Sequence, residues 1–158
     1  STFRLEFVFE EVKSVEKDVV PNEEIDLSGI RVILAEDNPI NALICESHLS
    51  KIGIKPVIVK DGKECVDRSL KSKEFEFDLI LMDIQMPNMN GYEATRVIRN
   101  SVREDHDILI LAMTADSFKE DVEKAFLNKM DGHISKPIVI EDMNNTIYSA
   151  LRKRGKIK

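Results

Sequence analysis

The chain has 158 residues, with 29 acidic and 23 basic side chains and a formal net charge of −6. That length suffices for one good core and leaves too little for a second independent domain. The acidic balance argues against a nucleic-acid-binding domain, which usually presents a basic face, and we interpret the basic residues at the C-terminus as a solvated helix end.

The two cysteines, Cys45 and Cys65, have neither a CxxC partner nor a histidine at ligand spacing. This spacing predicts no zinc site and no disulfide framework, and it fits buried thiols in a reducing compartment. No apolar stretch approaches the roughly 18 residues that span a membrane, and the N-terminus has no signal-peptide pattern. We therefore expect a soluble, cytoplasmic piece that makes no membrane contact itself, although a longer parent could be membrane-anchored.

The N-terminal segment has a period of two, because Phe3, Leu5, Phe7 and Phe9 occupy alternate positions. This pattern predicts one half-buried strand, for which no hairpin partner is near in the sequence. The residues that follow, up to about residue 28, are acidic and interrupted by Pro21, which is typical of a linker with little to bury.

From Ile30 onward, apolar runs of strand length alternate with segments of helical period, which predicts a βα repeat with a parallel sheet. Pro56 removes a ladder donor from the second strand, so we expect that strand at an edge of the sheet. The five strands are expected at residues 30–35, 54–59, 77–82, 108–112 and 133–135. The helices are expected at residues 39–53, 61–71, 92–103, 118–126 and 140–151.

Polar side chains stand where four of these strands end. Glu36 and Asp37 follow the first strand, Asp83 the third, Thr114 the fourth and Lys136 the fifth. Parallel strands bring these ends to one edge of the sheet, so the side chains are expected to converge in one cleft. Clustered carboxylates predict a hard divalent cation, most often Mg²⁺ in the cytosol. A carboxylate beside Mg²⁺ and a lysine can attack a phosphoryl group, so we predict an aspartyl phosphate at Asp83.

Each of these residues also has a plainer interpretation. Asp83 alone fits a turn or a helix cap, and Glu36 with Asp37 fits a helix N-terminus with favourable charges. Thr114 fits a helix cap, and Lys136 fits a surface position. Their coincidence at four strand ends favours the shared site over these separate interpretations.

Segments 32–38, 78–91, 112–115 and 134–138 resemble the receiver domain of two-component response regulators. The resemblance implies an α/β fold with a doubly wound, five-stranded parallel sheet of flavodoxin-like and CheY-like (βα)5 type, in strand order 2-1-3-4-5. It makes Asp83 the phosphoacceptor. It also implies that Asp37, Asp83 and the backbone carbonyl of Gln85 bind Mg²⁺, or Mn²⁺ in its place, with Glu36 acting through a metal-bound water.

The same resemblance gives roles to the other residues of the cleft. Thr114 would hydrogen-bond the phosphoryl group and move toward it, and Lys136 would pair with it. Three residues before the lysine, the family commonly has a rotating Tyr or Phe, and this chain has His133 as a smaller, titratable switch residue. Gln85 and Asp116 occupy the two positions that tune dephosphorylation by guiding a water molecule.

Ser1-Thr2-Phe3 and the alternating residues after it resemble the last strand of the ATP-binding domain of sensor histidine kinases. We therefore expect a kinase remnant at residues 1–10, an acidic linker at 11–28, a receiver at 29–153 and a basic tail at 154–158. This order is that of a hybrid histidine kinase with a C-terminal receiver. The expected partners are the kinase dimerisation domain, as the phosphohistidine donor, and a histidine phosphotransfer domain, as the acceptor. Without a kinase core, the chain would catalyse only its own phosphorylation and dephosphorylation.

Two other functions remain as alternatives. A degenerate receiver would act only as a protein-binding module, but all five site residues are retained. A phosphatase of the haloacid-dehalogenase type also uses a strand-end Asp, but it needs a second Asp where this chain has Gln85. A nicotinamide-binding Rossmann enzyme is excluded because the first βα turn has no GxGxxG.

Overall fold

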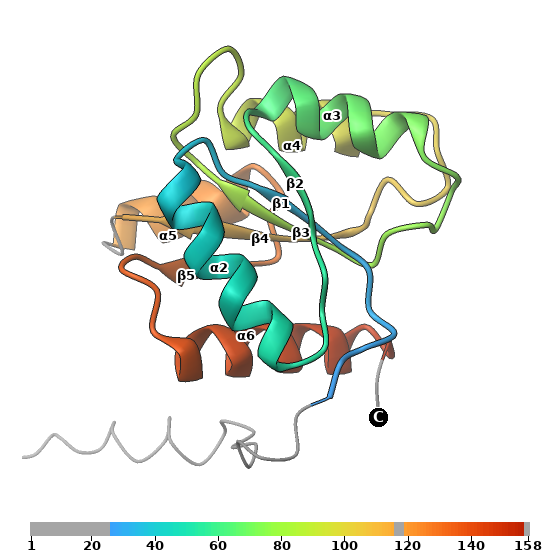
Figure 1. Cartoon of the computed structure of the whole chain (residues 1–158). Helices are drawn as coiled ribbons and strands as arrows, with labels where there is room; N and C mark the ends of the chain where they lie inside the picture. The colour runs from blue at the N-terminus through green and yellow to red at the C-terminus, as the bar shows by residue number, and fades with distance from the viewer. Residues whose placement is uncertain (1–25, 116–118, 157–158) are drawn as a thin grey trace, which may run out of the picture.

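The computed structural model describes residues 26–115 and 119–156. In this part of the chain, five parallel strands form one sheet in the order β2-β1-β3-β4-β5 (Figure 1). The predicted doubly wound fold and strand order are thereby confirmed, including the edge position predicted from Pro56. The kinase strand predicted at residues 1–10 and most of the linker predicted at 11–28 lie outside the described residues.

The helices and strands end within a few residues of their predicted limits. The strands are β1 Val32–Ala35, β2 Val57–Val59, β3 Leu79–Asp83, β4 Leu109–Thr114 and β5 Gly132–Ser135. The helices are α2 Pro39–Lys51, α3 Gly62–Lys71, α4 Gly91–Arg99, α5 Lys119–Leu127 and α6 Ile140–Lys153. Pro56 lies just before β2 rather than inside it, which is consistent with its missing N–H donor.

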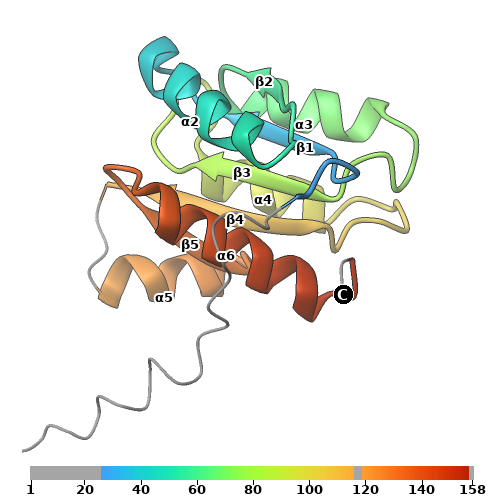
Figure 2. The same ribbon diagram turned by 60° about the horizontal axis from the view of Figure 1, so that its bottom comes forward.

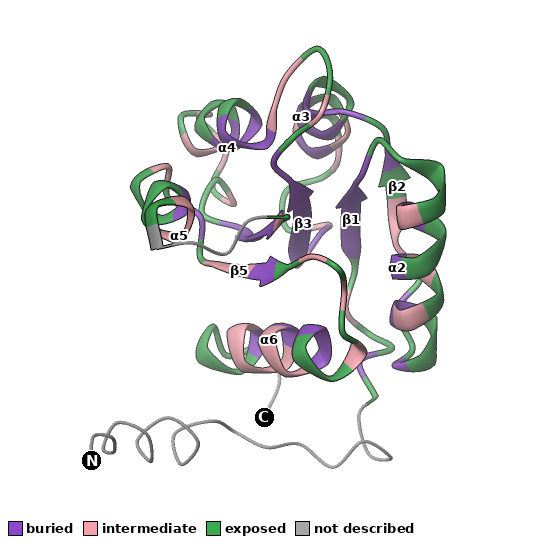
Figure 3. Ribbon diagram, turned by 90° about the vertical axis from the view of Figure 1, so that its left-hand side faces the viewer, coloured by how far each residue is buried: buried purple, intermediate pink, exposed green. Residues whose placement is uncertain are grey.

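Each face of the sheet has its own core, because successive side chains of a strand point to opposite faces (Figure 3). One core lies between the sheet and the helices α2 and α6, and it contains Leu34, Leu81 and Leu111. The other lies beneath α3, α4 and α5, and it contains Ile33, Ile80 and Ile110. Since both faces are covered, the central strands are unbroken apolar runs.

Helix α5 is packed more thinly than its sequence pattern predicts. Ala125 is buried, but Phe126 and Leu127 are 55% and 82% exposed. Phe126, the last residue of the helix predicted at 118–126, therefore does not face the core, and Phe118, the first residue of that helix, lies outside the described residues. Consecutive helical positions point about 100° apart, so a narrow contact can bury only one of them.

The end of the sheet opposite the polar cleft is fixed by Arg99, at the end of α4. Its guanidinium pairs with the carboxylate of Asp131 at 3.0 Å and donates to the carbonyl oxygens of His106, Ile108 and Lys129. Both α5 and α6 pack against β5 (Figure 2). Within the described ranges, no helix has the length and apolar character that would let it cross a membrane.

Gly91 allows α4 to begin directly against the end of β3. A Cβ atom at this position would lie 2.5 Å from the carbonyl oxygen of Asp83 and 2.9 Å from Cγ of Met82. We predict that Gly91→Ala lowers the free energy of unfolding by about 1–3 kcal/mol, because the backbone of Asp83 has to move. Urea denaturation measures this change. Gly29→Ala is the control, since a Cβ there meets nothing within 4 Å; equal stability of the two variants would contradict the close approach.

Candidate functional site

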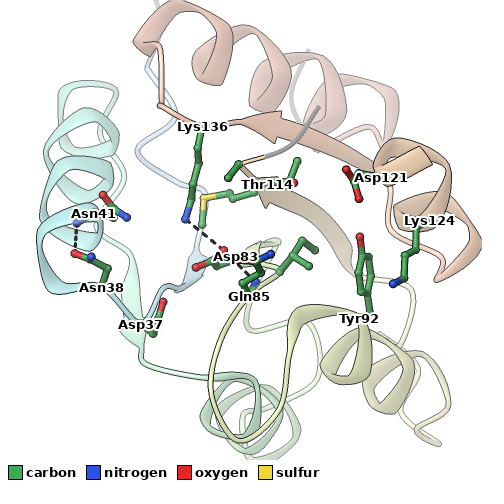
Figure 4. A pocket seen from close by; sticks show the side chains of 13 residues that line it. Asp37, Asn38, Asn41, Asp83, Gln85, Tyr92, Thr114, Asp121, Lys124 and Lys136 are labelled. Atoms are coloured by element: carbon green, nitrogen blue, oxygen red, sulfur yellow. Dashed lines mark hydrogen bonds and ion pairs between the residues drawn. The ribbon is translucent and has the colours of Figure 1, made fainter. Parts of the chain in front are cut away.

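The carboxylate of Asp83 lies at the carboxyl edge of the sheet, where β3 ends. The residue is only 5% exposed. Its Oδ1 atom is 3.3 Å from Nζ of Lys136 and accepts a long hydrogen bond of 3.4 Å from the backbone N–H of Gln85. Lys136 reaches this carboxylate from the chain that follows β5, as Figure 4 shows.

A second buried carboxylate shares the same ammonium group. Glu36, at the end of β1, is 2% exposed, and its Oε1 atom accepts a hydrogen bond of 2.9 Å from Lys136. Its Oε2 atom accepts from the backbone N–H of Asn38 at 3.2 Å. One carboxylate oxygen from each of Glu36, Asp83 and the exposed Asp37 lies within 4.8 Å of the other two. The three predicted carboxylates therefore do converge.

This cluster carries more negative than positive charge, and this excess shifts the pKa values of Asp83 and Lys136. Burial and the charge of Glu36 raise the pKa of Asp83 to about 7, and Lys136 offsets this effect only in part. Burial disfavours the charged form of Lys136, but the hydrogen bond to Glu36 and the charges of both carboxylates raise its pKa overall. An additional cation would relieve the repulsion between the carboxylates.

The donor set fits a hard divalent cation such as Mg²⁺. Carboxylate oxygens are the ligands that this ion prefers, and the exposed Asp37 leaves one side open for the water molecules that Mg²⁺ retains. Gln85, whose backbone carbonyl is the other predicted ligand, lines the same cavity as Asp37 and Asp83.

The loop between Asp83 and α4 is held in place by the start of α3. The amide of Asn88 donates to Asp61 at 2.7 Å, and the N–H of Gly62 donates to the carbonyl of Met89 at 3.0 Å. Asn88 has a φ of 66°, a left-handed conformation that Asn tolerates better than most residues. These contacts fix the backbone that carries Gln85 beside Asp83.

Thr114 is the last residue of β4 and lines the same cavity as Asp83 and Lys136. Its carbonyl oxygen accepts a hydrogen bond of 2.8 Å from the backbone N–H of Lys136. His133 lies elsewhere, half-buried on β5, where it lines a groove with residues of α6. Asp116 lies outside the described residues. The switch role of His133 and the tuning role of Asp116 therefore stay predictions.

The cavity around Asp83 has a volume of about 450 Å³ and a wall that the sequence did not indicate. In the view of Figure 4, Tyr92 from α4 and Asp121 and Lys124 from α5 stand across the cavity from Asn38 and Asn41. The ammonium of Lys124 lies 4.8 Å from the centroid of the Tyr92 ring. Two features of the sequence could have indicated this wall. Tyr92 comes directly after the turn that follows Asp83, and a helix begins soon after Thr114.

Comparisons with known proteins agree with this geometry. The family model of the response regulator receiver domain matches residues 32–148. The chain is 41% identical, over 122 residues, to hybrid signal transduction histidine kinase I of Dictyostelium discoideum, and the match covers 72% of this chain and 7% of that kinase.

Two solved receiver domains have the same fold. One belongs to the sensor histidine kinase PA1611 of Pseudomonas aeruginosa and has a magnesium ion coordinated in its active site cleft. Its sequence is 30% identical to this chain, the TM-score is 0.65, and the match covers 78% of this chain and 95% of that chain. The other is the receiver domain of Ssk1 from Saccharomyces cerevisiae in complex with the histidine phosphotransfer protein Ypd1. Its sequence is 28% identical to this chain, the TM-score is 0.67, and the match covers 78% of this chain and 90% of that chain. From its strand order, its acidic cluster and these matches, we conclude that the chain belongs to the response regulator receiver domain family.

Proposed function

We propose that this domain accepts a phosphoryl group on Asp83 from a phosphohistidine and passes it to the histidine of a phosphotransfer protein. The observation that carries the proposal is the buried Asp83 carboxylate, which belongs to an acidic cluster and lies 3.3 Å from the ammonium of Lys136. A buried nucleophile beside a fixed cation is suited to phosphoryl transfer, where catalysis consists mainly of positioning and charge stabilisation.

The transfer makes one bond and breaks one. An oxygen of Asp83 bonds to phosphorus while the P–N bond to the donor imidazole breaks, and the bonding electron pair stays on the imidazole nitrogen. Lys136 offsets negative charge on the phosphoryl oxygens, and the Thr114 hydroxyl donates to one of them. Mg²⁺ held by Asp37, Asp83 and the Gln85 carbonyl, with Glu36 acting through water, would neutralise further charge on those oxygens.

An apolar helix face beside the cavity supports another protein as the partner. Ile40, Leu43 and Ile44 of α2 are 69%, 64% and 43% exposed, while Asn38 and Asn41, at the same end of the helix, line the cavity with Asp83. Since Asn38 and Asn41 form part of the cavity wall, we propose this face of α2 as the docking site of a phosphotransfer protein. The Ssk1 receiver, to which this chain is similar, was solved in complex with the histidine phosphotransfer protein Ypd1.

The relatives support a hybrid histidine kinase as the parent protein. The chain spans only 7% of the length of the Dictyostelium kinase, so the match does not include a kinase dimerisation domain. We propose that such a domain in the parent protein carries the phosphohistidine that serves as the donor. The division of residues 1–28 into a kinase remnant and a linker stays a prediction, as do the limits of the receiver at 29–153 and of the tail at 154–158.

The phosphoacceptor is tested by intact-mass analysis after incubation with acetyl phosphate and Mg²⁺. We expect one phosphoryl adduct that hydroxylamine removes, and no adduct with EDTA or in Asp83→Asn. Asp67→Asn, on the exposed side of α3, is the matched control and should still accept the group. A folded wild-type domain that takes no adduct would overturn the proposal and favour a protein-binding module.

The raised pKa of Asp83 predicts a pH dependence of stability. The unfolded chain releases this proton near the ordinary value of 3.8, whereas the folded domain keeps it up to about pH 7. Stability that the protonated group contributes at low pH is therefore lost as the pH rises through this window. We expect Asp83→Asn to match the wild type near pH 4 and to exceed its free energy of unfolding by about 1–3 kcal/mol at pH 8.

Urea denaturation of both proteins in EDTA, across this pH range, measures the difference. A constant difference from pH 4 to pH 8 would contradict the raised pKa. At pH 8, added Mg²⁺ should raise the melting temperature of the wild type, because a ligand that binds the folded state stabilises it, and should raise that of Asp83→Asn much less.

The docking face is tested by Leu43→Asp. We expect this change to weaken binding to a phosphotransfer protein that serves the wild-type domain by about tenfold or more, because a charge replaces an apolar contact. Phosphorylation by acetyl phosphate should be unchanged. Val102→Asp is the control, since Val102 is also an exposed apolar residue but lies beyond the far end of α4. Equal binding by both variants, measured by calorimetry, would exclude α2 as the docking site.

A further inference from the structure

Lys124 and Tyr92 form a contact at the mouth of the phosphoacceptor cavity that the proposed chemistry has not used. Tyr92 is 8% exposed, at the start of α4, so its ring is fixed by packing. Lys124 is exposed on α5, with Nζ 4.8 Å from the ring centroid. Both residues line the cavity around Asp83 and also a neighbouring hollow that contains Asp37 and Gln85. The pair therefore stands where the two spaces meet.

The ammonium group of Lys124 differs from the other ammonium group of the cavity in its contacts. Among the described residues that line the cavity, Lys124 and Lys136 carry the ammonium groups. Lys136 is already engaged by two carboxylates, Glu36 at 2.9 Å and Asp83 at 3.3 Å. Lys124 instead rests on an aromatic face, a contact that is weak at exposed sites and is readily exchanged for a contact with an anion.

We propose that Lys124 is a second anion-binding group of the cavity, held on Tyr92 in the resting domain, that moves to the outer oxygens of an incoming phosphoryl donor. This inference rests on the proposed function and adds a positioning residue to it. Lys124 makes no bond to phosphorus. Its charge attracts the donor and orients the phosphoryl oxygens away from Asp37, so that the phosphorus atom faces Asp83.

The surroundings of Lys124 support this role. Asp121 lies one helical turn before Lys124 on α5 and lines the same cavity, so both charged side chains extend from the same wall. Burial, with a further contribution from Asp121, raises the pKa of Tyr92, which keeps the phenol neutral beneath the ammonium. The long lysine side chain can leave the ring without any movement of the buried Ala125 next to it.

The rate of phosphorylation by acetyl phosphate, at saturating Mg²⁺, tests the proposal. We expect Lys124→Gln to lower the second-order rate constant by about 3- to 10-fold at low salt, and the loss to shrink as salt screens the charge. Lys124→Arg should restore most of the rate, because it keeps the charge. Lys71→Gln, an exposed lysine at the far end of α3, is the matched control. Calorimetry should give Lys124→Gln a Mg²⁺ affinity no lower than that of the wild type, which separates anion binding from a metal effect.

A spectroscopic readout follows the proposed movement directly. The chain has no tryptophan and two tyrosines, Tyr92 and Tyr148. In a Tyr148→Phe background, the emission of Tyr92 should change when Asp83 is phosphorylated, because the ammonium leaves the ring. The change should be absent when Lys124→Gln is added to that background.

Three outcomes are decisive. A Lys124→Gln domain that is phosphorylated at the wild-type rate at every salt concentration would overturn the role of Lys124 while the proposed function stands. An equal loss of rate in Lys71→Gln would also overturn it, since the effect would then come from net charge. A wild-type domain that accepts no phosphoryl group would overturn the proposed function, and this inference with it.

Discussion

The whole site depends on two buried carboxylates, Glu36 and Asp83, that share one ammonium group, Lys136. Burying carboxylates is costly unless cations or hydrogen bonds receive them, and one lysine does not balance two. The raised pKa of Asp83 reflects this imbalance. In the proposed function, a bound metal ion supplies the positive charge that the cluster lacks. The domain thus keeps a locally unfavourable arrangement at the one place where binding of a cation can relieve it.

The sequence predicted the parts of this site that depend on strand ends. Asp83 follows Leu79–Met82, whose unbroken apolar character shows that both faces of β3 are covered. Parallel strands of known order leave little freedom in where their carboxyl ends lie, so Glu36, Asp37, Thr114 and Lys136 could be placed beside Asp83. The edge position of β2 was also predictable from the sequence, because Pro56 has no N–H to donate to a neighbouring strand.

The parts that depend on how helices are rotated and seated could not be predicted in the same way. Tyr92 and Lys124 line the cavity because α4 and α5 lie side by side, and the periodicity of each helix alone does not determine how the two are seated. Phe126 fits an apolar stripe as well as Ala125 does, and only the narrow contact of α5 leaves it exposed. His133 lies on β5, in a groove beside α6, and its switch role stays a prediction.

The thin packing of α5 has a consequence for how the domain changes conformation. Near its C-terminal end, Arg96 holds Asn128 at 2.6 Å and Arg99 holds the carbonyl of Lys129 at 3.0 Å, whereas Ala125 is the buried residue of the helix in the described part of the chain. A helix that buries so little apolar surface has a small free-energy difference between its docked position and a displaced one. A difference in binding energy of about 1.4 kcal/mol between two such positions changes their ratio tenfold. A change of charge in the cavity can therefore redistribute the population of α5 positions while both cores of the sheet stay intact.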